Sequence, residues 1–294
     1  MGLRRYPQTL CRHRGGGIGG IMKPKQSYQN KFFSVLGDSL STLAGCNPPD
    51  YAVFYTWENC CAANVFSVAD TWWGKVIEEL GGFLLVNNSY SGSLVCKHPA
   101  CEIESYGCSD TRTGALGTSD IAPDVVMILM GLNDFGAGMP IRPAENKKVG
   151  NAHSKLLAYR RFSCSSATQT ARSVLRNFLW HKKDLSVFSE AYGTMLKKIK
   201  KNYPETEIWC LTLPCGYRRA EPLQRPPLVR AGGNLGDYCK AIRKCAEENG
   251  CFSLDIFCPE EPYDSLDGYH PNADGMQTIA NAVLQAAERS VFGR

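Results

Sequence analysis

Short runs of apolar residues recur along the chain, and turn-forming residues such as Gly, Pro and Asn flank them. Most of these runs are continuous and do not alternate with polar positions, which is typical of strands covered on both faces of a parallel sheet. Five buried strands are therefore predicted, at residues 32–37, 83–87, 124–130, 207–213 and 252–257.

The segments between these runs carry apolar residues at intervals of three or four, with polar residues on the opposite side, as amphipathic helices do. Strands that alternate with helices predict an open, doubly wound α/β sheet. In such a sheet ligands bind beyond the carboxyl ends of the strands, so these ends are the places to look for chemistry. The predicted helices are residues 71–82, 184–204, 234–250 and 272–290.

The 294 residues are enough for one large domain or two small ones. The net charge is +5, and the positive surplus is concentrated before the first predicted strand. We expect residues 1–30 to form a basic, disordered leader and residues 31–294 a single domain, with Met1 or Met22 as the start. Residues 135–183 break the alternation and are expected to form an insert.

Several function classes are not expected from this sequence. No apolar run approaches the roughly 18–20 residues of a membrane span, and the first 22 residues contain no apolar core of a secretory signal. A cytoplasmic protein is therefore expected. No broad basic face with interleaved aromatic residues is visible, so nucleic acid is not an expected partner.

Polar residues follow the predicted strands. Gly-Asp-Ser stands at 37–39, Asn-Asn-Ser-Tyr-Ser-Gly-Ser at 87–93, Gly-Leu-Asn-Asp at 131–134, and an Asp/His pair lies within 263–271. Each stretch alone has an ordinary turn or cap composition. Together they place a hydroxyl, a glycine amide, an asparagine amide and an Asp/His pair at one sheet edge, and these are the parts that acyl transfer requires.

The blocks GDSL (37–40), NNSYSGS (87–93), GLND (131–134) and DGYH (267–270) resemble, in order, those of the GDSL, or SGNH, hydrolases. The resemblance spans about residues 32–290. It implies a three-layer α/β/α sandwich around a five-stranded, mostly parallel, flavodoxin-like sheet. It also implies a serine esterase that forms an acyl-enzyme intermediate and requires no cofactor.

By this resemblance Ser39 is the nucleophile, His270 the general base, and Asp267 the residue that orients the imidazole. The backbone amides of Ser39 and Gly92 and the side chain of Asn133 are the oxyanion donors. The spacing is physically reasonable, since a carboxylate three residues before the histidine reaches Nδ1 while Nε2 faces the serine.

The substrate is less well defined by the sequence. Aromatic residues in the loop after the Gly-Asp-Ser corner could stack on a sugar, which suggests carbohydrate O-deacetylation beside short-chain acyl esters; alternatively, these rings pin the loop to the sheet. A thioesterase and a catalytically silent binding module are further alternatives. The candidate substrate-binding residues are Asp38, Tyr51, Phe54, Tyr55 and Trp57.

The chain contains 14 cysteines, and in a reducing compartment free thiols or metal ligands are expected rather than disulfides. Cys96, His98, Cys101 and Cys108 lie within thirteen residues and could hold a structural zinc ion. Their spacing matches no standard zinc module, so buried thiols are the preferred interpretation and no metal is favoured.

Overall fold

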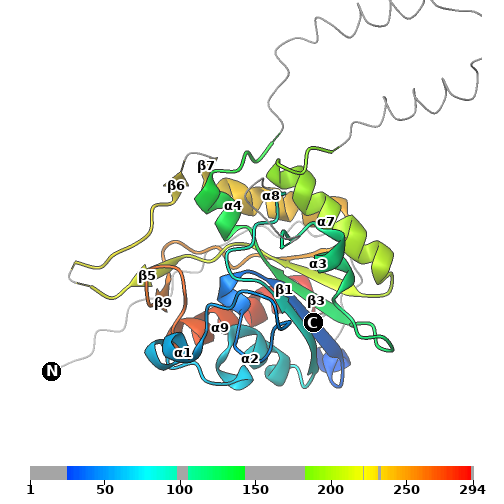
Figure 1. Ribbon diagram of the computed structural model, residues 1–294, viewed down its shortest axis with the longest axis horizontal. Coiled ribbons are helices and arrows are strands. Elements are labelled where there is room, and N and C mark those ends of the chain that lie inside the picture. Colours follow the sequence, from blue (N-terminus) through cyan, green and yellow to red (C-terminus); the bar gives the residue numbers. More distant parts are fainter. Residues whose placement is uncertain (1–24, 98–104, 143–182, 221, 231–232, 293–294) are drawn as a thin grey trace, which may run out of the picture.

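The computed structural model describes residues 25–97, 105–142, 183–220, 222–230 and 233–292. A five-stranded sheet forms the centre, with the strand order β2-β1-β3-β4-β8 and every neighbouring pair parallel. Helices cover both of its faces (Figure 1). The predicted three-layer α/β/α sandwich is confirmed. The strands are β1 (Phe32–Gly37), β2 (Phe83–Ser89), β3 (Val125–Leu129), β4 (Glu207–Leu211) and β8 (Phe252–Leu254).

Strand side chains point alternately to the two faces of the sheet, and both faces are buried. Val35 of β1 packs into one apolar cluster with helices α2 (Trp72–Glu79) and α9 (Ala273–Ser290). The next residue, Leu36, packs into the other cluster with α7 (Phe188–Asn202) and α8 (Leu235–Glu248). This two-sided burial explains why the strand sequences are continuously apolar.

Three of the helices that cover the sheet begin at side chains that accept a free backbone N–H of the first turn. Thr71 accepts from Gly74 at α2, Asn234 from Gly236 at α8, and Asn272 from Gly275 at α9. The remaining elements are shorter, and the β5–β9 and β6–β7 pairs lie to the left of the sheet in Figure 1. They are η1 (Lys25–Tyr28), η2 (Ser39–Ser41), α1 (Trp57–Ala63), η3 (Val68–Asp70), α3 (Asp110–Gly114), α4 (Leu132–Ala137), β5 (Gly216–Arg218), β6 (Val229–Arg230), β7 (Gly233–Asn234) and β9 (Tyr263–Ser265).

The folded domain includes residues that precede the predicted boundary at residue 31. Tyr28 is buried, its hydroxyl donates to Glu207 at 2.8 Å, and its ring lies 5.4 Å from that of Trp209 and 5.3 Å from that of Phe292. Residues 25–30, assigned to the leader by the sequence, therefore belong to the domain. Residues 1–24 lie outside the described residues.

The predicted insert at 135–183 is described only at its two ends. Its first residues, 135–137, belong to helix α4, and Phe135 is buried in the core. Residues 143–182 are outside the described part of the chain. Within the described ranges, no helix has the length and apolar character needed to cross a membrane.

Candidate active site

The first three strands end level with one another at the carboxyl edge of the sheet. Gly37 of β1 pairs with Ser89 of β2 on one side and with Leu129 of β3 on the other. The segments after these three strands, which carry Ser39, Gly92 and Asn133, therefore start from adjacent points. This register is what gathers residues that are far apart in sequence.

Ser39 stands at the start of the short helix η2, directly after the strand. Asp38 caps this helix by accepting from the Leu40 amide at 3.1 Å. The hydroxyl of Ser39 lies 2.9 Å from Nε2 of His270, although 231 residues separate the two along the chain.

Asp267 completes a hydrogen-bonded chain from the serine to a carboxylate. Its Oδ2 lies 2.7 Å from Nδ1 of His270, and its Oδ1 accepts the backbone amides of Tyr269 at 2.9 Å and His270 at 2.8 Å. Burial alone would raise the pKa of Asp267, but hydrogen bonds from the His270 ring and from the two amides lower it to about 2. The carboxylate is therefore ionised at neutral pH and holds the imidazole proton on Nδ1, which leaves Nε2 free to accept the Ser39 hydroxyl.

The imidazole is also held by its neighbours. The ring of Phe54 stacks on it with centroids 3.4 Å apart and an interplanar angle of 6°. At the residue after the histidine, the carbonyl of Pro271 accepts the Tyr55 hydroxyl at 2.6 Å. The loop that follows Ser39 thus packs against the loop that carries His270.

Gly92 lies at the third position of a tight turn in which the Ser93 amide donates to the Tyr90 carbonyl at 3.2 Å. Its φ of +78° is the conformation that a type II turn requires at this position. A Cβ at Gly92 would meet no atom within 4 Å, so open space adjoins this stretch of backbone.

Asn133 is oriented by a bond to the same turn. Its Nδ2 donates to the Ser93 carbonyl at 3.0 Å. A primary amide carries two N–H groups, so one is used by Ser93 and the other remains for a further acceptor. The structure thus links the asparagine of α4 to the residue that follows Gly92.

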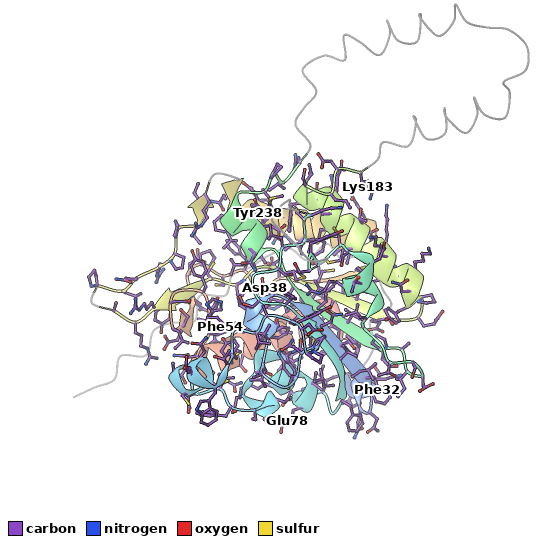
Figure 2. All side chains as sticks on the ribbon, viewed as in Figure 1. Phe32, Asp38, Phe54, Glu78, Lys183 and Tyr238 are labelled. Carbon is purple, nitrogen blue, oxygen red and sulfur yellow. The ribbon has the colours of Figure 1, made fainter. Side chains whose placement is uncertain are left out.

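The five candidate substrate-binding residues fall into different environments. Asp38 is in the interior (Figure 2), with 1% of its surface exposed, and burial is the main reason that its pKa rises to about 7. Tyr55 is fully buried. The prediction that these two side chains contact substrate is therefore wrong: Asp38 caps η2, and Tyr55 joins its loop to the loop that carries His270.

The other three candidates keep some exposure, and each has an aromatic or histidine partner. Phe54 stacks on His270, as described above. Tyr51 lies 5.0 Å from the Tyr90 ring. Trp57 is 75% exposed and lies 6.3 Å from Phe66.

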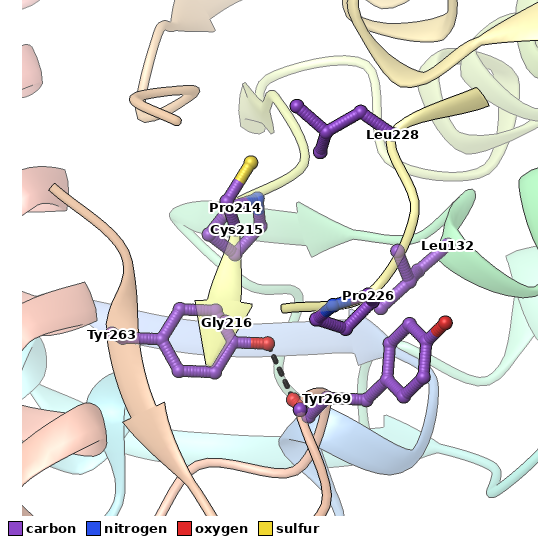
Figure 3. A pocket seen from close by; sticks show the side chains of 9 residues that line it. Leu132, Pro214, Cys215, Gly216, Pro226, Leu228, Tyr263 and Tyr269 are labelled. Atoms are coloured by element: carbon purple, nitrogen blue, oxygen red, sulfur yellow. Dashed lines mark hydrogen bonds between the residues drawn. The ribbon is translucent and has the colours of Figure 1, made fainter. Parts of the chain in front are cut away.

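A small apolar pocket of about 20 Å³ adjoins the loop that carries Asp267 and His270 (Figure 3). Leu132, which lines it, precedes Asn133, and Gly268 and Tyr269 lie between Asp267 and His270. A volume of this size holds little more than one water-sized group. The other lining residues are Pro214, Cys215, Gly216, Pro226, Leu228 and Tyr263.

The sequence analysis missed two buried charged residues near the site. Asp134 is fully buried and accepts the amides of Val95 at 2.8 Å and Cys96 at 2.9 Å, which ties the loop after Gly92 to α4. Burial raises the pKa of Asp134, against these hydrogen bonds. Asp134 could have been found from the sequence, because it is the last residue of the GLND block (131–134). Arg112 is also fully buried, and nothing in its local sequence indicated this.

The candidate zinc ligands are only partly described. Cys96 and Cys108 are buried, and burial raises the pKa of the Cys108 thiol to about 12. His98 and Cys101 lie outside the described residues. Among the residues that are described, no group of three His, Cys, Asp or Glu side chains could hold a metal ion. The zinc site stays a prediction.

Comparison with solved structures supports the architecture. The fold matches a candidate GDSL-like lipase of Bacteroides ovatus with a TM-score of 0.59 and 22% identity, covering 89% of this chain and 99% of the other. A candidate GDSL-like lipase of Bacteroides uniformis matches with a TM-score of 0.57 and 24% identity, over 88% and 96%. A possible lipase of Chitinophaga pinensis matches with a TM-score of 0.53 and 14% identity, over 88% and 98%. At these identities the matches show the fold.

A search among curated proteins found no match. A family model, by contrast, matches residues 31–166, the region that carries the Gly-Asp-Ser corner, the Gly92 turn and the Gly-Leu-Asn-Asp block. The model describes the GDSL-like lipases and acylhydrolases, so this part of the chain is similar to that family.

Proposed function

We propose that this protein is a serine hydrolase that cleaves carboxylic esters through an acyl-enzyme intermediate. The observation that supports it most strongly is the continuous chain of hydrogen bonds from Ser39 through His270 to Asp267. A serine hydroxyl is a weak nucleophile at neutral pH and needs an adjacent base. Here the base lies at 2.9 Å.

In the first half of the reaction, Nε2 of His270 takes the proton of the Ser39 hydroxyl while Oγ attacks the ester carbonyl carbon. The carbonyl oxygen becomes an anion, which the amides of Ser39 and Gly92 and the Nδ2–H of Asn133 would bind. The tetrahedral intermediate collapses, the bond from carbon to the alcohol oxygen breaks, and the imidazolium gives its proton to that oxygen. The alcohol leaves, and the acyl group remains on Ser39.

In the second half a water molecule replaces the alcohol. His270 takes a proton from the water, the hydroxide attacks the acyl carbon, and the same donors bind the second oxyanion. Collapse releases the carboxylic acid, and the proton returns to Ser39 Oγ. Asp267 stays ionised throughout and stabilises the imidazolium that forms in each half. No step requires a cofactor.

The substrate we propose is an ester with a short acyl group, such as acetate, on a carbohydrate. The pocket beside the site is apolar and about 20 Å³ in volume, which suits a methyl group rather than a long chain. The aromatic rings of Phe54 and Tyr51 would offer apolar faces to the alcohol part. A thioester would react by the same steps, with a thiol as the leaving group.

The test is hydrolysis of p-nitrophenyl acetate by the wild type and by Ser39→Ala. We expect kcat to fall by at least about 10³-fold in the variant, as in other triad knockouts. Ser34→Ala is the matched control: this buried serine lies in β1, the strand that leads to Ser39, its hydroxyl donates to the Leu116 carbonyl, and the variant should keep the wild-type rate. Equal rates in wild type and Ser39→Ala would refute the assignment.

A second assay addresses the acyl group and the alcohol. We expect the p-nitrophenyl ester rate to fall from acetate to butyrate to octanoate, because the longer chains exceed the pocket. Acetylated oligosaccharides and acetyl-coenzyme A, compared at equal concentration, separate the sugar ester from the thioester. A preference for octanoate would exclude the short-acyl substrate while leaving the serine mechanism intact.

A further inference from the structure

The fully buried guanidinium of Arg112 lies behind the candidate active site and uses all of its donors. Nε donates to Asn88 Oδ1 at 2.8 Å. Nη1 donates to Ser93 Oγ at 2.9 Å and to the Ser105 carbonyl. Nη2 donates to the carbonyls of Gly37 and Asn88, both at 2.9 Å. An arginine has five N–H donors, so none is left over.

Four of these five acceptors, those of Gly37, Asn88 and Ser93, belong to segments that carry proposed oxyanion donors. Gly37 ends β1 and lies two residues before Ser39. Ser93 follows Gly92 in the turn, and the Ser93 carbonyl in turn accepts from Asn133. One rigid, planar group therefore joins the end of β1 to the end of β2 and to the turn at Ser93.

The charge of Arg112 is not paired within hydrogen-bonding distance. Its five acceptors are carbonyl, amide and hydroxyl oxygens, and within the described ranges no carboxylate forms an ion pair with it. Its guanidinium carbon also lies 5.6 Å from the centre of the Tyr51 ring. Burial lowers its pKa to about 10, so the group remains positive at neutral pH.

We propose that Arg112 is a positioning residue for the oxyanion hole: it fixes the spacing of the Ser39, Gly92 and Asn133 donors and contributes a buried positive charge behind them. The inference rests on the proposed function. Fixed donors and a fixed charge stabilise a developing anion without reorganisation during the reaction. Because this effect is larger in the transition state than in the bound ester, removing Arg112 should lower kcat and leave KM nearly unchanged.

The experiment compares Arg112→Met and Arg112→Lys with the wild type on p-nitrophenyl acetate. We expect kcat to fall about 10²-fold in Arg112→Met, the lower end of what loss of one oxyanion donor costs. Arg112→Lys keeps the charge but loses the planar guanidinium, so its kcat should lie between those of the wild type and Arg112→Met. KM should stay within about threefold, because ester binding does not use these contacts.

Inhibition by methylboronic acid provides a readout that a purely structural role would not change. The boronate forms a tetrahedral adduct with a serine hydroxyl, so its affinity should fall by about the same factor as kcat. Arg243→Met is the matched control: Arg243 forms an ion pair with Asp255 at 3.0 Å. Its loss should lower the thermal midpoint without changing kcat or boronate affinity.

Ser93→Ala covers the case in which Arg112→Met does not fold, since it removes one acceptor of the guanidinium and keeps the charge. A fall in kcat of about tenfold is expected, because the lost hydrogen bond has a charged donor. Folded Arg112 variants that keep kcat and boronate affinity within threefold of wild type would overturn the inference, as would a loss confined to KM. If the wild type showed no Ser39-dependent hydrolysis, the proposed function itself would fail, and the Ser39→Ala control reports that separately.

Discussion

The replacement Asn133→Ala separates the catalytic and structural roles of one side chain. The Nδ2 group carries two hydrogens, of which one is bound by the Ser93 carbonyl at 3.0 Å. The second would be available for the oxyanion. Loss of one such donor costs about 2.7–4 kcal/mol of transition-state stabilisation, which corresponds to a fall in kcat of about 10²–10³-fold.

The expected loss of folding stability in Asn133→Ala is smaller than the loss of transition-state stabilisation. One neutral hydrogen bond to a backbone carbonyl contributes about 1 kcal/mol to the free energy of unfolding, and for a domain of this size that lowers the thermal midpoint by about 2 °C. Steady-state kinetics on p-nitrophenyl acetate would show a large loss in kcat with little change in KM. Thermal unfolding followed by circular dichroism would show a small shift.

The matched control is Asn249→Ala. Nδ2 of Asn249 also donates to one backbone carbonyl, that of Cys245 at 2.7 Å, but at the far end of α8. It should lower the thermal midpoint to a similar extent and leave kcat unchanged. If both variants lost the same small fraction of kcat, Asn133 would be a structural residue and the assignment of the third oxyanion donor would be refuted.

Three further predictions concern the surroundings of the triad and the start of the domain. The pKa of Asp267 is about 2 in the folded protein and 3.8 ordinarily, so the ionised carboxylate stabilises the fold above pH 4, and this stabilisation is lost as the pH falls through 2. In urea unfolding, the free energy of unfolding of the wild type should exceed that of Asp267→Asn by about 1 kcal/mol at pH 6, a value that allows for the half-exposed side chain. The difference should be smaller at pH 2.5. A difference that grew on acidification would contradict this. Phe54→Ala removes the ring stacked on His270 and should lower kcat about 10-fold while the thermal midpoint changes little. The reason is that a misplacement of a catalytic group by 1 Å can lower the rate by as much as about 10²-fold. An unchanged kcat would show that stacking does not position the imidazole. Tyr28→Ala removes a buried ring and should lower the free energy of unfolding in urea by about 3 kcal/mol, and a loss below about 1 kcal/mol would contradict the placement of Tyr28 in the core.

The strands were predictable because burial on both faces of the sheet requires continuous runs of apolar residues. Residues 32–37 were predicted to the residue, and the predicted order of strands and helices is the order observed. The fifth strand, predicted to continue to residue 257, ends at Leu254. Beyond it, the amides of Ile256 and Phe257 donate to the Thr212 hydroxyl rather than to a neighbouring strand. Such a change of partner is not visible in hydrophobicity.

The residues of the candidate site were likewise predictable only in part. Asp267 and His270 are three residues apart, so their contact follows from local geometry and could be predicted. The surroundings of Arg112 depend on β1, on the end of β2 and on the turn at Ser93 being brought together by the fold. The sequence Ser-Asp-Thr-Arg-Thr around it is typical of a solvated helix start. Charged residues buried by long-range contacts are therefore the part of the site that sequence reasoning missed.

The aromatic loop after Ser39 shows why the side-chain type did not decide its function. Tyr55 and Trp57 are two residues apart and equally suited to line a pocket, yet one is fully buried and the other is 75% exposed. The Tyr55 hydroxyl reaches across 216 residues to the Pro271 carbonyl, next to His270. Because the Ser39 loop and the His270 loop lie at opposite ends of the chain, a short contact between nucleophile and base requires a bond that joins these loops. The buried tyrosine supplies that bond, and its value to an ester hydrolase lies in geometry rather than in contact with substrate.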